Sequence, residues 1–285
     1  MILSMTGFGR AEDVFEGKKI SIDIKSLNSK SFDLNIKIPL RYKEKEFEIR
    51  KILNDRIIRG KVDCYITLEN LEESNDVKIN KPLIDSYISE LRGIASDGPD
   101  FEYLKMAVRL PEAVTTRPDE LTEGEWENLA AIISLALDRF EEFRRTEGKI
   151  LHEELERNIQ NIDRSLAEVL PYEEERIISV RERYQKALKE FENVDETRFY
   201  QEMAYFTEKL DISEEKVRLA QHLKYYKEVM DNEDFNGKKL GFISQEIGRE
   251  INTLGSKANH AEIQKLVVMM KDDLEKIKEQ TLNVL

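Results

Sequence analysis

The spacing of apolar residues changes once along the chain, and this change constrains the fold more than any other feature. In the first 70 residues apolar side chains alternate with polar ones, most regularly at Phe32, Leu34, Ile36 and Ile38. From residue 125 onward they recur at every third or fourth position. Strict alternation is typical of a sheet with one covered face, and the wider spacing is typical of amphipathic helices. The sequence therefore predicts an α+β protein: a mainly antiparallel N-terminal sheet with helices, a long helical, coiled-coil-like region, and a helical C-terminal domain.

Three domains are expected, over residues 1–124, 125–194 and 195–285. Within the first, a strand is expected to open the chain at 2–8, helices at 44–57 and 81–94, and a loop at 96–121, where Gly and Pro gather. The middle region has coiled-coil spacing up to Pro171, which is expected to kink the helix or turn the chain. Two interpretations of this region stay open: a solvated helical hairpin, or an arm that contacts another protein or another copy of the chain.

Composition excludes several classes of protein. The formal net charge of −13 argues against nucleic-acid binding through bulk positive charge, although it permits a local basic groove. No run of 18 apolar residues is present, so no membrane-spanning helix is expected, and the N-terminus lacks the pattern of a secretory signal. The single cysteine, Cys64, excludes an internal disulfide and a cysteine-based zinc site. A reducing cytoplasm is the simplest setting.

The segment 237–260 carries the most specific chemistry. On a helix, its apolar residues form one narrow stripe: Leu240, Ile243, Ile247, Ile251 and Leu254. Two polar stripes flank it: Glu246, Glu250, Thr253 and Lys257 on one side, and Gln245, Arg249, Asn252 and Ser256 opposite the core. Carboxylates one turn apart suit a hard divalent cation, Arg and Lys suit phosphate, and Asn suits a sugar or base. The alternative is an ordinary helix stabilised by weak intrahelical Glu–Arg pairs.

A second constellation lies at 211–222. Glu215, Arg218 and His222 are spaced to share one helix face, and Asp211 with Glu214 fits a capping box. A histidine with such neighbours can be a general base, a metal ligand or a structural hydrogen-bonding group. Several catalytic and nucleotide-binding signatures are missing: there is no Walker loop, no GxGxxG after a strand, no GxSxG and no HExxH. The glycines around Phe8 are too few for a phosphate loop and are interpreted as positions within a strand or bulge.

Several segments together resemble one known family. They are MTGFGRAE, SLNSKSFD, RGKV at 59–62, the DISEE…RL…H block, GKKLGFISQEIGREINTLGSKAN, and EKIKEQTLN near the end. This combination is similar to the YicC/YloC family. The resemblance implies a bacterial cytoplasmic endoribonuclease that assembles as a homohexamer, uses Mn²⁺ or Mg²⁺, and clamps RNA between its α/β and helical parts. The chain departs from the family pattern at His260, where Asp is usual, and at Ser29 and Lys30, where His-Arg is common.

With this resemblance, the residues are assigned as follows. Glu215, Glu246 and Glu250 are predicted to hold the metal ion or orient water, and His222 to transfer a proton or act as a ligand. RNA-binding residues are predicted at Arg10, Lys30, Arg218, Arg249, Asn252 and Lys257. A metal-free route, in which the RNA 2′-OH attacks and His222 is the base, stays open. So do two rival functions: a ring-forming RNA-binding adaptor that assists another nuclease, and a structural coiled-coil assembly factor.

Overall fold

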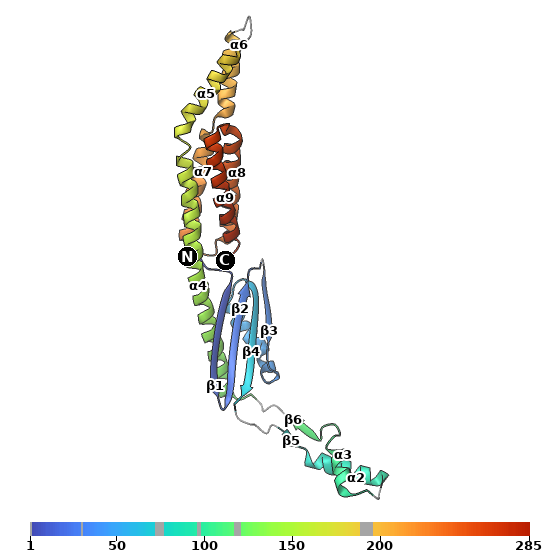
Figure 1. Cartoon of the computed structure of the whole chain (residues 1–285). Helices are drawn as coiled ribbons and strands as arrows, with labels where there is room; N and C mark the ends of the chain where they lie inside the picture. Colours follow the sequence, from blue (N-terminus) through green and yellow to red (C-terminus); the bar gives the residue numbers. More distant parts are fainter. Residues whose placement is uncertain (1, 30, 72–76, 96–97, 117–120, 189–195) are drawn as a thin grey trace.

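The computed structural model describes residues 2–29, 31–71, 77–95, 98–116, 121–188 and 196–285. It is an elongated α+β molecule, with a sheet near its middle and a helical bundle at one side of the sheet (Figure 1). The two ends of the chain meet between these parts, where Leu285 donates its N–H to the Leu3 carbonyl at 2.9 Å. No helix in the described ranges is long and apolar enough to cross a membrane.

The sheet has four strands in the order β1-β2-β4-β3. Their bounds are β1 Gly7–Phe15, β2 Lys18–Leu27, β3 Phe32–Lys37 and β4 Gly60–Asn70. The first two pairings are antiparallel, as predicted, but β3 runs parallel to β4, so the sheet is mixed. A parallel pair needs a crossover, which the 3-10 helix η1 (Leu40–Lys45) and helix α1 (Glu46–Arg56) supply. The strand expected at 2–8 begins only at Gly7.

The first half of the long helix α4 (Glu123–Ala167) covers one face of this sheet. Two glycines of β1 allow the close approach: a Cβ on Gly9 would lie 2.1 Å from the Ala136 carbonyl oxygen, and one on Gly7 would lie 2.4 Å from the Phe140 ring. The prediction that these glycines are structural positions in a strand is confirmed. The core formed here includes Ile20, Ile22, Ile24, Leu53, Val62, Leu129 and Ile133. Burial of Cys64 in the same core raises the pKa of its thiol to about 12.

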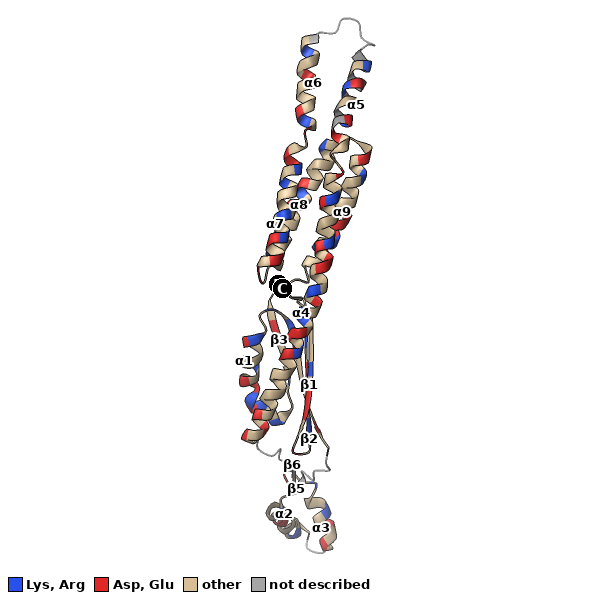
Figure 2. Cartoon of the chain, turned by 90° about the vertical axis from the view of Figure 1, so that its left-hand side faces the viewer, with Lys and Arg blue, Asp and Glu red and all other residues tan. Residues whose placement is uncertain are grey.

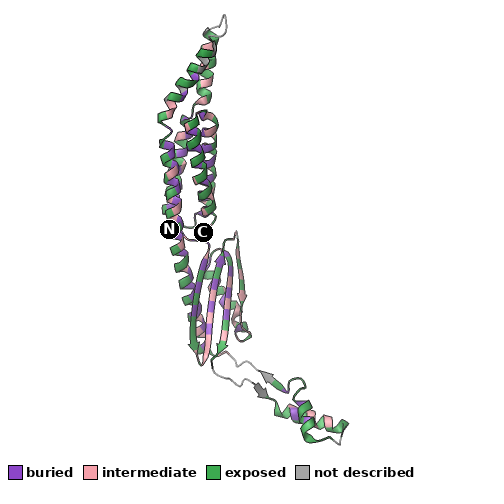
Figure 3. Cartoon of the chain, in the orientation of Figure 1, coloured by how far each residue is buried: buried purple, intermediate pink, exposed green. Residues whose placement is uncertain are grey.

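The second half of α4 belongs to a helical bundle. It packs with α7 (Ser213–Asn232), α8 (Gly237–Ala258) and α9 (Ala261–Thr281), and α8 lies between α7 and α9. Buried residues gather on the inner faces of these helices (Figure 3). Helices α5 (Pro171–Leu188) and α6 (Glu196–Leu210) extend beyond the bundle at the end away from the sheet (Figure 1). Pro171 is the first residue of α5, so the predicted interruption is a turn between helices.

A small subdomain lies at the opposite end of the molecule (Figure 1). It contains the two-stranded sheet of β5 (Val77–Ile79) and β6 (Val114–Thr116), together with α2 (Lys81–Ile94) and α3 (Asp100–Ala107). The loop expected at 96–121 was wrong at α3 and β6. Pro99 precedes α3 as its N-cap, so the proline that suggested a loop marks a helix start, and eight residues are too few for a clear periodicity.

A buried carboxylate fixes the start of α4. The side chain of Glu125 accepts hydrogen bonds from Arg41 Nε at 2.7 Å and from the Tyr42 hydroxyl at 2.9 Å. Burial on its own would raise the pKa of Glu125, but the hydrogen bonds from Arg41 and Tyr42 outweigh it and hold the pKa below its usual 4.5.

A Glu125→Gln variant is therefore expected to lose about 3 kcal/mol of stability at pH 7, because Arg41 loses its buried counter-ion. Since the pKa of Glu125 is depressed on folding, its contribution is present above the unfolded pKa and is lost as the pH falls through the folded pKa. Urea unfolding at pH 7 and at successively lower pH checks this, and the gap between variant and wild type should narrow below pH 4.5. A gap that is constant with pH would contradict this role.

Candidate active site on the α7–α8 face

The stripes predicted on α8 form as expected. Leu240, Ile247, Ile251 and Leu254 are fully buried, and Ile243 is 6% exposed. Gly241, Gly248 and Gly255 face α9, where their nearest atoms belong to Thr281, Leu274 and Val267. A half-buried stripe lies on the side of α8 next to α7, where Lys257 contacts Glu215. Its residues are Glu246, Glu250, Thr253 and Lys257. The stripe of Gln245, Arg249, Asn252 and Ser256 faces solvent.

One ion pair and a shared core fix how α7 and α8 lie against each other. Near one end, Lys257 Nζ is 2.7 Å from Glu215 Oε1. Further along, Tyr226 of α7 and Leu240 and Ile247 of α8 are buried in the same core. The helices are antiparallel neighbours in a hairpin. His222 is seven residues beyond Glu215, so this register places it level with the α8 turn between Glu246 and Glu250.

Two titratable groups of this face, His222 and Glu250, have no side-chain partner among the described residues. Neither side chain makes a hydrogen bond or ion pair with any residue in the described part of the chain, and both are partly exposed. The nearby guanidinium groups are paired, but only within their own helices: Arg218 with Glu214, and Arg249 with Glu246 at 2.7 Å. Exposed pairs of this kind contribute little, on the order of 0.5 kcal/mol, so both arginines can exchange their carboxylates for phosphate.

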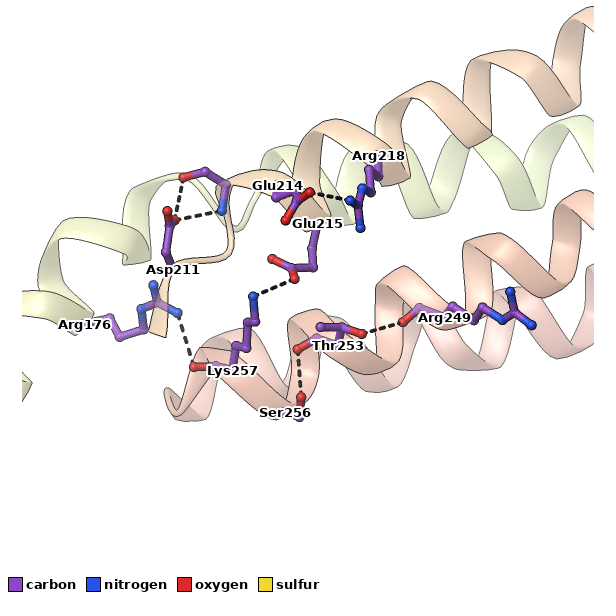
Figure 4. Close-up of polar contacts among 10 residues, drawn as sticks. Arg176, Asp211, Glu214, Glu215, Arg218, Arg249, Thr253, Ser256 and Lys257 are labelled. Carbon is purple, nitrogen blue, oxygen red and sulfur yellow. Dashed lines mark hydrogen bonds and ion pairs between the residues drawn. The ribbon is translucent and has the colours of Figure 1, made fainter. Parts of the chain in front are cut away.

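Glu215 is more deeply buried than Glu246 and Glu250. Its side chain points from α7 towards Lys257 (Figure 4) and the residue is only 4% exposed. Its second oxygen, Oε2, is buried and accepts no hydrogen bond from any described residue. Glu215 is the ion-pair partner of Lys257. The three predicted metal ligands, Glu215, Glu246 and Glu250, are therefore not placed to share one metal ion. Among the described residues, no three His, Cys, Asp or Glu side chains are placed to share a metal ion.

Glu246 and Glu250 nevertheless fit a weakly held divalent cation. They are one turn apart, and Glu250 forms no ion pair with a described residue. Mg²⁺ in proteins commonly keeps several waters and is held by one or two carboxylates together with phosphate oxygens of the substrate. Two carboxylates are therefore a sufficient protein contribution if RNA supplies the remaining ligands.

The C-terminal end of α8 is stabilised by Arg176 of α5 and by its own C-cap residue, Asn259. Arg176 of α5 is buried and donates from Nη1 to the carbonyl oxygens of Lys257 at 3.5 Å and Ala258 at 3.4 Å. Burial lowers the pKa of Arg176. Asn259 ends the helix in the left-handed conformation with φ of 41°, which Asn tolerates better than most residues. Arg176 was missed by the sequence analysis because it lies in the middle region, where no motif marks it.

The predicted capping box is wrong. Asp211 accepts hydrogen bonds from the backbone N–H and hydroxyl of Ser213, at 2.9 and 2.7 Å, and so forms a local turn. The N-cap of α7 is Ile212, which has no side-chain acceptor, and Glu214 pairs with Arg218 instead (Figure 4).

Other predicted residues lie away from this face. Arg10 is exposed on β1, next to Glu12 at 3.3 Å and Asp23 at 3.7 Å, on the sheet rather than the bundle. Lys30 lies outside the described residues. His260 precedes α9, but its side chain does not cap the helix. The ring lies 5.3 Å from that of Tyr172, and Nδ1 is buried with no hydrogen-bond partner in the part of the chain that the structure describes.

Basic and acidic side chains are interspersed on the described helices of the bundle (Figure 2). Lys and Arg mix with Asp and Glu along α7, α8 and α9 (Figure 2). The basic side chains near His222 are therefore a local feature of an acidic protein.

The molecule thus joins an α+β domain to a helical bundle, one face of which carries an imidazole, carboxylates and arginines. Residues 2–153 match the family model described as "Endoribonuclease YicC-like, N-terminal region", and residues 169–285 match "Endoribonuclease YicC-like, C-terminal". The chain belongs to this YicC-like endoribonuclease family.

Full-length relatives agree with this assignment. The chain is 32% identical over 292 residues to a protein of Clostridioides difficile (strain 630) named "Probable endoribonuclease YicC", with all of both chains covered. It is 29% identical over 293 residues to a protein of the same name from Haemophilus influenzae, again with all of both chains covered.

The Lys257–Glu215 pair gives a test of stability. Lys257→Ala leaves the Glu215 carboxylate buried and unpaired, so a loss of about 3 kcal/mol is expected. The double variant Lys257→Ala/Glu215→Gln should recover most of this loss, because the buried charge is gone. Arg249→Ala serves as a control on the same helix and should change stability by less than about 0.5 kcal/mol, since its pair is exposed. Equal losses in the single and double variants, measured by urea unfolding, would contradict the pairing.

Proposed function

We propose that this protein is a metal-dependent endoribonuclease and that RNA phosphodiester bonds are cleaved at the α7–α8 face. One observation carries the proposal. His222, which has no partner in the described chain, is level with the turn of α8 that bears Glu246 and Glu250. The names of the two full-length relatives support RNA as the substrate class.

Each group of the face has a role that its chemistry suits. His222 takes the proton from an attacking water at a ring nitrogen, as a general base. The new P–O bond forms as the P–O bond to the leaving RNA oxygen breaks, and that oxygen takes a proton from solvent. Arg218 and Arg249 bind phosphates on either side of the scissile bond, and Lys257, held in place by Glu215, adds a third positive charge. Asn252 is exposed on the same helix and can hydrogen-bond a sugar or base.

The proposed cofactor is Mn²⁺ or Mg²⁺. Glu246 and Glu250 would hold the ion, together with phosphate oxygens of the RNA. When bound, such an ion neutralises developing negative charge on the phosphoryl oxygens. Glu215 is left out of this set, because its carboxylate is the buried counter-ion of Lys257.

A homohexamer in the cytoplasm completes the proposal. In the described part of the small subdomain the apolar core is small, with a cluster of Ile84, Ala107 and Ala113, while Ile94 and Phe101 are 84% and 70% exposed. Apolar surface of this kind is typical of contacts between chains. Assembly would also gather the local basic groups of several copies into one channel for RNA, despite the net charge of −13. The buried free thiol of Cys64 suits a reducing compartment.

RNA binding tests this proposal apart from cleavage. The double variant Arg218→Ala/Arg249→Ala should weaken binding of a labelled single-stranded RNA, because two phosphate contacts are lost. The slope of log K against log salt should fall by about 1.4, at about 0.7 for each contact. Fluorescence anisotropy in EDTA measures this without turnover. Arg92→Ala, an exposed arginine on α2, is the matched control. Binding and slope equal to wild type would contradict the proposed RNA path.

A further inference from the structure

A pocket opens between α5, α6 and the C-terminal end of α8, beside the Glu215–Lys257 pair. Its volume is about 340 Å³. One part of its wall is apolar, formed by Val180, Phe206 and Leu210, and the remainder is polar, formed by Lys209, Ser256, Lys257 and Asn259.

The polar groups of the pocket have unused hydrogen-bonding capacity. Within the described part of the chain, the side chains of Lys209 and Asn259 make no hydrogen bond or ion pair. The hydroxyl of Ser256 donates to the Thr253 carbonyl at 2.9 Å, so its oxygen is still able to accept. Lys257 gives one of its three ammonium protons to Glu215.

We propose that this pocket binds one unstacked nucleotide of an RNA strand. The base would lie against Phe206 and Val180, the phosphate between Lys209 and Lys257, and the sugar near Asn259 and Ser256. This inference rests on the proposed function and deepens it, since it names the form of RNA that the site selects.

Three features of the pocket favour a nucleotide. The volume falls at the lower end of the range for ligand pockets and is enough for a single nucleotide but not for a base pair. An aromatic wall beside two ammonium groups and an amide matches a base, a phosphate and a ribose. Proteins that recognise single-stranded RNA commonly place unstacked bases on aromatic side chains.

The pocket is also continuous with the candidate active site. Lys257 belongs to both, because it lines the pocket and pairs with Glu215 on the α7–α8 face. A nucleotide held here would fix the position of the neighbouring phosphates along α8. Bases within a duplex are stacked and paired, so the pocket favours cleavage next to loops, bulges and single-stranded segments.

The test uses full-length protein and adenosine 5′-monophosphate as the probe, with adenosine and inorganic phosphate as comparison ligands. Saturation-transfer NMR is expected to show transfer from the protein to the adenine protons. Phe206→Ala should weaken binding of the monophosphate about tenfold or more, because the stacking surface is lost. Lys209→Ala should weaken the monophosphate but leave adenosine unchanged. Lys209 is an exposed residue in the last turn of α6, so this variant is expected to fold normally.

Tyr200→Ala is the matched control, since Tyr200 is 64% exposed on the same helix and does not line the pocket. Binding that needs both Phe206 and Lys209 supports the pocket. Absence of saturation transfer, or equal transfer in wild type, Phe206→Ala and Lys209→Ala, overturns it. If the monophosphate does not bind while RNA is still cleaved, the pocket alone is wrong. If it binds at this site while RNA is never cleaved, the nucleotide pocket stands and the proposed activity is wrong.

Discussion

His222→Ala is expected to slow RNA cleavage by about 10² to 10⁴-fold, the range that general bases contribute. The imidazole has no partner within the described chain and is level with Glu246 and Glu250, so its removal takes away the proposed proton acceptor. RNA affinity should stay within about twofold of wild type, because the phosphate contacts of Arg218, Arg249 and Lys257 are kept. The rate constant of cleavage under single-turnover conditions measures the first effect, and anisotropy measures the second.

His152→Ala is the matched control for this experiment. His152 is a partly exposed histidine on α4 that pairs with Asp231 at 2.8 Å, and no part of the proposed chemistry uses it. Cleavage at the wild-type rate by His222→Ala would show that the proton acceptor is another group. A loss of RNA binding with no change in the single-turnover rate would assign His222 to recognition instead.

Gly9→Ala is expected to destabilise the N-terminal domain by about 3 kcal/mol or more, at the upper end of the cost of overpacking a core. The added Cβ would lie 2.1 Å from the Ala136 carbonyl oxygen and 2.7 Å from the Phe140 backbone nitrogen. Both atoms belong to the backbone of α4, so no side-chain rotation relieves the contact and the helix must move away from β1. The single tryptophan, Trp126, packs against the same core from α4 and reports unfolding of this domain by fluorescence.

Gly93→Ala provides the contrasting substitution. Gly93 lies in α2, and no atom of the described residues is within 4 Å of the position where its Cβ would be. This variant should be unchanged or slightly more stable, by about 0.5 kcal/mol, because Ala favours helix more than Gly. Equal urea midpoints for Gly9→Ala and wild type would mean that α4 does not pack on β1 as described.

The sequence predicted correctly those features that depend on the spacing of residues within one helix or strand. The stripes of α8 follow from its 3.6-residue period alone, and α2 begins and ends at Lys81 and Ile94, where it was expected. The interpretation of Gly7 and Gly9 was also confirmed, because glycines within a strand commonly mark close approach of another element.

The sequence did not predict contacts between separate helices and strands, because these depend on how the elements pack in the folded chain. The pairing of Glu215 with Lys257 requires the register of α7 against α8, which no local pattern encodes. For the same reason Glu215 was grouped with Glu246 and Glu250, although the bundle turns it towards a lysine. Arg176 reaches the end of α8 from a helix 81 residues earlier in the chain than Lys257, and only the folded bundle brings them together. The parallel pairing of β3 likewise depends on the crossover through α1.

Cleavage of a labelled structured RNA, with Mn²⁺ and with EDTA, tests the central claim most directly. Wild type would be compared with Glu246→Gln/Glu250→Gln, after circular dichroism has shown that the variant folds. The proposed site predicts internal cuts that need the metal ion and are lost in the variant, while RNA binding persists. Cuts that survive both EDTA and the substitutions would contradict metal-dependent cleavage at this face, and wild type that binds RNA but never cuts it would instead favour an RNA-binding adaptor.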